Sequence, residues 1–107
     1  MIHGVISELG TAQGYATLAV STTAVALPAA LSGTKENAQA AYVTVETNSV
    51  RYRVDGVDPT ATEGHLMPAT VGPETGLWIY GSMNVVRARF IRASADGTVK
   101  VTYYSGM

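Results

Sequence analysis

The sequence predicts a small all-β protein, a single antiparallel β-sandwich of the immunoglobulin-like or jelly-roll-like type. Two observations predict it. Apolar and polar residues alternate with a period of two over several short segments, and Gly, Pro, Asn or Asp interrupts the chain about every 8–12 residues. The 107 residues suit one domain. We therefore expect about six to eight short strands and no helix longer than about three turns.

The chain begins with a weakly patterned, glycine-containing stretch. We expect residues 1–14 to form an N-terminal arm and residues 15–107 to form the sandwich domain. The density of β-branched residues over 15–31 favours strand over helix. A further strand is expected over 40–47, with its valines facing inward and Thr44 and Glu46 facing outward.

The alternation is clearest in the middle of the chain. Residues 50–54 (VRYRV) alternate apolar residues with arginines, which is typical of a half-buried strand. Asp55-Gly56 follows as a turn in which glycine tolerates a positive φ, and Asp58-Pro59 provides a second reversal. Short strands are then expected near 65–67 and over 77–80.

The last third of the chain predicts a β-hairpin. Residues 86–90 (VRARF) again alternate apolar residues with arginines, which predicts a half-buried strand. Asp96-Gly97 is a two-residue hairpin signal, so we expect it to join this strand, ending near Ala93, to a strand over 99–103. In such a turn Gly97 would hold a positive φ.

Composition excludes several classes of function. Charged residues make up 14% of the chain and the net charge is −1, so no basic face is expected for nucleic acid. The absence of cysteine removes disulfides, thiolate metal sites and cysteine nucleophiles. The uncharged stretch over 9–34 contains too many Thr, Ser and Gln residues for a membrane span, and the first residues lack the features of a signal peptide.

One group of residues could carry chemistry. Asp55, Asp58, Glu63 and His65 lie within one loop region and could surround a hard cation such as Ca²⁺. Their spacing does not match an EF-hand, and the two aspartates have ordinary roles in turns. No nucleophile motif or glycine-rich phosphate loop accompanies them. We therefore expect no catalytic residue, no metal and no cofactor, and hence no enzyme activity.

Candidate interface residues come from two arginine pairs and a C-terminal tyrosine. Each pair has i, i+2 spacing and so lies on one face of its expected strand, where it could bind acidic patches of a neighbouring subunit. A solvated face with weak ion pairs remains an equal alternative. Tyr103 and Tyr104 must point to opposite faces, so one of them is expected at the surface or against a partner. The candidate interface residues are Arg51, Arg53, Arg87, Arg89 and Tyr104.

Residues 42–104 resemble a family of small virion structural proteins of tailed bacteriophages. In that family the pattern ITVET…(I/V)RYR(L/V)DGxxPTATEGH is followed by an (F)(R/K)xIR segment and a closing strand. This chain has VTVET at 43–47, VRYRVDGVDPTATEGH at 50–65, IRA at 91–93 and VKVTY at 99–103. The resemblance implies a structural protein of the virion, assembled in the host cytoplasm, whose partners are the major capsid protein or other virion subunits.

Three functions follow as expectations. The first is a capsid decoration or cement protein that binds the assembled shell as a homo-oligomer. The second is a tail, neck or baseplate component. The third is a carbohydrate-binding accessory module, because the strand-turn over 50–60 is also similar to a YTxDGxxPT segment in immunoglobulin-like modules of chitobiases. Coplanar exposed aromatic rings would favour the third. A buried Trp78 and an apolar or arginine-lined face would favour the virion functions.

Overall fold

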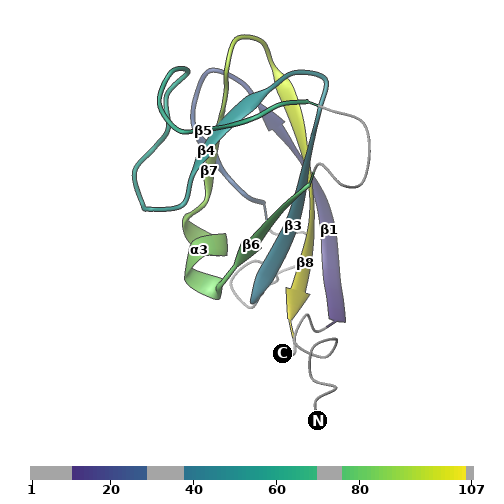
Figure 1. Cartoon of the computed structure of the whole chain (residues 1–107). Coiled ribbons are helices and arrows are strands. Elements are labelled where there is room, and N and C mark those ends of the chain that lie inside the picture. The colour runs from purple at the N-terminus through teal and green to yellow at the C-terminus, as the bar shows by residue number, and fades with distance from the viewer. Residues whose placement is uncertain (1–10, 29–37, 70–75, 106–107) are drawn as a thin grey trace.

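Two antiparallel four-stranded sheets pack face to face and form a β-sandwich (Figure 1). The computed structural model describes residues 11–28, 38–69 and 76–105. One sheet, called sheet A here, has the order β1 (Thr11–Val20), β8 (Gly97–Ser105), β3 (Ala40–Glu46) and β6 (Leu77–Tyr80). The other, sheet B, has the order β2 (Val25–Ala26), β7 (Arg89–Arg92), β4 (Val50–Arg53) and β5 (His65–Met67). The predicted all-β sandwich is confirmed.

Alternation along the two central strands of sheet A builds half of the core. Val43 and Val45 of β3 are buried and lie opposite Val101 and Val99 of β8. Tyr103 continues the inward row of β8; its side chain is fully buried and its hydroxyl donates to the carbonyl oxygen of Pro28. The inward valines and the outward position of Glu46 agree with the sequence prediction.

Sheet B supplies the opposing half of the core. Val50 of β4 and Phe90 of β7 are fully buried, and Tyr52 lies opposite Phe90 in the ladder. Met67 of β5 pairs with Val50 and is also buried. Because β-branched and aromatic side chains of the two sheets interdigitate, burial of these apolar surfaces is the main stabilising term of the fold.

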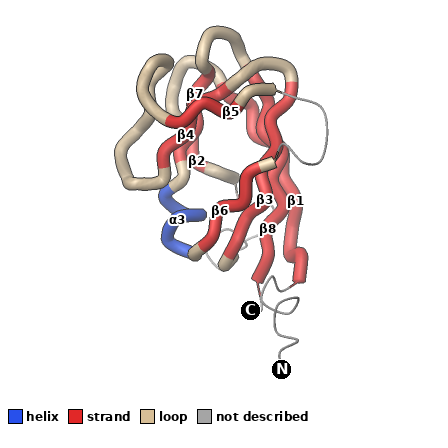
Figure 2. The backbone as a smooth tube through the Cα atoms, viewed as in Figure 1, coloured by secondary structure: helices blue, strands red, loops and turns tan. Residues whose placement is uncertain are grey.

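The prediction of a strand over 86–90 is wrong for the first half of this segment. A short helix, α3 (Ser82–Arg87), occupies this segment and leads from β6 in sheet A to β7 in sheet B (Figure 2). Val85 and Ala88 are both fully buried, so the apolar positions that matter are spaced by three residues, which suits a helical turn. The helix starts after Gly81, at φ 95°, and the side-chain amide of Asn84 donates to the Tyr80 carbonyl at 2.8 Å.

The prediction of a β-hairpin at Asp96-Gly97 is also wrong. β7 ends at Arg92 and lies in sheet B, whereas β8 begins at Gly97 and lies in sheet A, so the segment between them connects the two sheets. Asp96 anchors this connection through Arg92 Nη1 at 2.7 Å and Ser21 Oγ at 2.9 Å. These hydrogen bonds, the one from Arg92 first, lower the pKa of Asp96.

The first strand begins earlier than the sequence suggested. β1 starts at Thr11, so residues 11–14 of the expected arm belong to a strand that pairs with β8, with a register shift between Ala12 and Gly14. Residues 1–10, and the end of the strand region expected over 15–31, lie outside the described residues. No helix in the described part of the chain is long and apolar enough to cross a membrane.

Gly97 is required by close packing and not by the positive φ expected for it, which only Gly56, Gly64 and Gly81 have among the described glycines. A Cβ atom at this position would lie 2.5 Å from the carbonyl oxygen of Asn48 and 3.1 Å from Cγ1 of Val50. We therefore expect Gly97→Ala to destabilise the fold by about 1–3 kcal/mol, because backbone must move to admit the methyl group. Thermal unfolding followed by circular dichroism measures this. The neighbouring Thr98→Ala is the control and should change the melting temperature little; equal melting temperatures for the two variants would contradict the close approach.

Candidate functional site: the aromatic face of sheet A

Aromatic side chains gather on the outer face of sheet A. The ladders align Tyr15 of β1, Thr102 of β8, Tyr42 of β3 and Trp78 of β6 in one row across the sheet. The neighbouring row contains Tyr104 of β8, Ala40 of β3 and Tyr80 of β6. Because residues directly opposite each other project to the same side of a sheet, these side chains share one surface. We call Tyr15, Tyr42, Trp78, Tyr80 and Tyr104 the aromatic face.

Trp78 lies at the centre of the ring contacts. Its ring centroid is 4.9 Å from that of Tyr42 and 5.2 Å from that of Tyr104, with tilted geometries. Tyr80 stacks on it at 5.9 Å with an interplanar angle of 13°. Trp78 is half-buried by these neighbours, whereas Tyr80 is 56% exposed and Tyr15 is 59% exposed. Such contacts order the rings relative to one another.

Charge is confined to the other end of the same face. Lys100 lies opposite Thr17 and Thr44, and Glu46 lies opposite Thr98, so both charged residues are in rows beyond the aromatic ones. The ammonium group of Lys100 donates to Thr17 Oγ1 at 3.3 Å. The aromatic end of the face therefore presents ring surface and hydroxyl groups without an ionised side chain among its described members.

Of this face, the sequence placed only Tyr104 among the candidate interface residues. Tyr104 was expected at the surface or against a partner, and it lies outward, half-buried, while Tyr103 lies inward. A local signal existed for two others, because Trp78 and Tyr80 are two positions apart and must share a face of their strand. Tyr15 and Tyr42 come from strands that are distant in sequence, so only the sheet order brings them into the same row.

The arginines of β4 hold the following loop. Arg51 and Arg53 project from the outer face of sheet B, as the alternation predicted. Arg51 donates through Nε to the carbonyl of Ala61 at 2.9 Å and through Nη1 to that of Gly64 at 3.0 Å. Arg53 forms a two-pronged ion pair with Asp55, at 3.0 Å to Oδ1 and 2.5 Å to Oδ2. Each of these arginines thus donates from two of its nitrogen atoms to groups of its own chain.

The second arginine pair does not share a strand face. Arg87 ends α3, whereas Arg89 begins β7, opposite Arg53. The side chain of Arg87 donates to the carbonyl of Asp55 at 3.1 Å. Arg89 Nη1 donates to two carbonyls at the end of the helix, those of Val86 and Ala88, at 3.0 Å each. The arginines therefore fasten a loop and a helix end, and three of them, Arg51, Arg53 and Arg89, remain on the outer face of sheet B.

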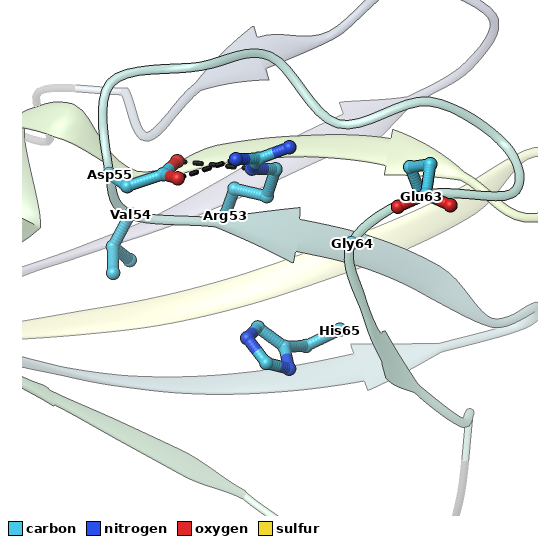
Figure 3. Close-up of a pocket in the computed structure, with 6 residues that line it drawn as sticks. All are labelled: Arg53, Val54, Asp55, Glu63, Gly64 and His65. Carbon is cyan, nitrogen blue, oxygen red and sulfur yellow. Dashed lines mark hydrogen bonds and ion pairs between the residues drawn. The ribbon is translucent and has the colours of Figure 1, made fainter.

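A shallow recess of about 410 Å³ lies at the acidic loop. Figure 3 shows its lining residues, with Arg53 and Asp55 pointing toward each other and His65 set apart from them. The lining also includes Glu63, Gly64 and Val54. Within the three described ranges, no three His, Cys, Asp or Glu side chains come together as a group that could hold a metal ion. Asp58 is exposed and does not line the recess.

No protein-family model, no curated protein and no solved structure matches this chain.

The ion pair with Arg53 lowers the pKa of Asp55. The hydrogen bond from Arg53 lowers the pKa of Asp55 from 3.8 to about 2, and that bond likewise raises the pKa of Arg53. A lowered carboxyl pKa means that Asp55 contributes stability above its unfolded-state pKa and loses that contribution as pH falls toward 2. We expect Arg53→Gln to return the Asp55 pKa toward 3.8, measured by carboxyl ¹³C NMR.

Arg92→Gln is the matched control for this experiment. It removes the cation beside Asp96, so the pKa of Asp96 should rise while that of Asp55 stays low. A pKa of Asp55 that does not change in Arg53→Gln would contradict the ion pair.

Proposed function

We propose that this protein is a structural component of a tailed-phage particle, and specifically a capsid decoration protein that binds the assembled shell through its aromatic face. The resemblance of residues 42–104 to small virion proteins supports a role in the phage particle. The observation that supports a docking surface is the set of five outward aromatic side chains on sheet A. Four of them, Tyr42, Trp78, Tyr80 and Tyr104, are joined by ring contacts, and Tyr15 and Tyr80 are more than half exposed.

Surfaces of this composition suit protein partners. Tyrosine and tryptophan are enriched at the centres of protein interfaces, where charged residues are depleted. A ring cluster that is already ordered loses little side-chain entropy on binding, so more of the contact energy appears as affinity. Trp78 is covered on its sides by Tyr42 and Tyr104, which is the arrangement of an interface anchor surrounded by supporting contacts.

The arginines support docking less strongly than their sequence pattern suggested. Each of the four donates to a carbonyl or a carboxylate of its own chain. A neighbouring subunit that took these donors would have to replace existing hydrogen bonds. We therefore place the main contact on sheet A and leave the outer face of sheet B, with Arg51, Arg53 and Arg89, as a secondary surface.

The mechanism is mass action. A small rigid domain that binds only the assembled lattice lowers the free energy of that lattice, and each bound copy adds to the stabilisation. No covalent chemistry is required. A tail, neck or baseplate position would use the same surface on a different partner, so the location of the bound protein separates these two functions.

Carbohydrate binding is the second candidate, because the rings of Trp78 and Tyr80 are nearly parallel, with an interplanar angle of 13°. A recess of about 310 Å³ that Tyr52, Trp78, Tyr80 and Asn84 help to line lies beside them. However, the rings of Tyr42 and Tyr104 are tilted by 49° and 50° against Trp78 and cover it, so the cluster is not a flat platform. Trp78 is half-buried, so the burial expected for the virion functions is not met, but the tilted rings around it favour a protein partner over a sugar.

The most exposed tyrosines provide the test. Purified protein added to particles assembled without it should bind saturably and raise the temperature at which the particles release DNA. The double variant Tyr15→Ser/Tyr80→Ser should bind at least about tenfold more weakly, since truncating an interface anchor costs about 1–2 kcal/mol or more. Both side chains are more than half exposed, so the isolated fold should persist.

Leu66→Ser is the control, because Leu66 is 51% exposed and lies on β5 of the other sheet. The chain has a single tryptophan, Trp78, so its fluorescence should change on binding and reports on the aromatic face directly. Binding only to tails or necks would favour the tail function. Retention on an insoluble polysaccharide, without binding to particles, would favour the carbohydrate module and refute the virion proposal.

A further inference from the structure

The four edges of the two sheets differ greatly in length. β2, β5 and β6 are edge strands of 2, 3 and 4 residues, whereas β1 is an edge strand of 10 residues at the margin of sheet A (Figure 1). Among the described residues, β1 pairs with β8 on one side and with no strand on the other. Long unpaired edges are templates for pairing with another chain, and natural proteins usually shorten or block them.

β1 carries almost none of the usual protection. Its sequence, TAQGYATLAV, contains no charged residue and no proline, the two commonest features that block edge pairing. The register shift between Ala12 and Gly14 disturbs only the beginning of the strand. From Gly14 to Val20 the ladder with β8 is regular, which leaves seven residues of uncharged edge without a further register shift.

The backbone groups at the free edge can be assigned from the ladder. The carbonyl of Tyr104 accepts from the amide of Gln39, so the backbone groups of Tyr104 face β3. Because these groups alternate along a strand, those of Val101 and Val99 face β1. Their partners in β1, Ala16 and Leu18, therefore point their N–H and C=O groups at β8. The alternate residues, Tyr15, Thr17 and Ala19, point theirs at the free edge.

We propose that this edge binds a second copy of the chain, antiparallel, with Thr17 on the two-fold axis. In this register Thr17 faces Thr17 of the other copy and Tyr15 faces Ala19. The backbone groups that point at the free edge therefore form hydrogen bonds between the two copies. An uncharged strand meets no like-charge repulsion when it pairs with itself. A two-fold contact of this kind is closed, which limits the assembly to a dimer.

The pairing has a consequence for the aromatic face. Opposed residues of an antiparallel pair project to the same side, so the two outer faces of sheet A become one continuous surface. On the inner side, half-buried Leu18 of each copy meets Ala16 of the other and loses exposure to water. A dimer would present two aromatic faces together, which raises the avidity for a partner with repeated sites. The dimer itself does not depend on the proposed particle role.

The oligomeric state of the purified full chain tests the proposal. Sedimentation equilibrium should give twice the monomer mass of 11.2 kDa at high concentration. Thr17→Pro removes one edge N–H and should shift the chain to the monomer, because that N–H is not used in the ladder with β8. Thr17→Ala is the control: like Thr17→Pro it lacks the threonine hydroxyl, but it keeps the backbone N–H, so this variant should remain a dimer.

Engineered cysteines test the register, since the chain has no cysteine of its own. Thr17→Cys places two thiols opposite each other and should form an intermolecular disulfide under mild oxidation, seen on a non-reducing gel. Tyr15→Cys would lie opposite Ala19 of the other copy and should crosslink at least tenfold less. Monomer mass for the unmodified chain at all concentrations would overturn the proposal, as would equal crosslinking of the two variants. Neither result depends on whether the protein binds particles.

Discussion

The pairing of β3 with β8 is the constraint on which the rest of the structure depends. These are the two central strands of sheet A, and their register places Val43 against Val101 and Val45 against Val99 in the core. The same register places Tyr42 opposite Thr102 and Ala40 opposite Tyr104 on the other side. A slip of one residue would exchange the two faces, burying hydroxyls and exposing valines. Core and aromatic face are therefore two results of one pairing.

Two connections between the sheets are held by hydrogen bonds or ion pairs from arginine side chains. The chain passes from sheet A to sheet B through α3 and returns through the segment that Asp96 anchors. At these two of the crossings an arginine binds groups of the connection: Arg89 binds carbonyls at the helix end, and Arg92 binds Asp96. Guanidinium groups suit this task because they offer several donors in a fixed plane. The concentration of arginine on these strands thus has a structural cause inside the domain.

The two sheets differ in the contacts that the side chains on their outer faces make within the chain. The outer face of sheet B carries arginines tied to the loop that follows β4, whereas the outer face of sheet A carries rings that contact one another and still expose Tyr15 and Tyr80. The long strand β1 borders the aromatic face. Within the described residues, the most exposed rings of the aromatic face and the longest edge strand therefore belong to the same sheet.

The sequence by itself determined the fold class and the inward and outward residues of the regular strands, because alternation with a period of two is a local property that burial on one face enforces. It failed where a choice depended on distant partners. Residues 86–90 have the alternation of a strand, yet Val85 and Ala88 are buried by a helical turn that the passage between sheets requires. Asp96-Gly97 has the composition of a hairpin turn, yet Gly97 is needed because the backbone of Asn48 approaches it closely. Tyr15, Tyr42 and Trp78 became neighbours in one row only through the strand order, since cross-strand pairing joins residues that local sequence cannot relate.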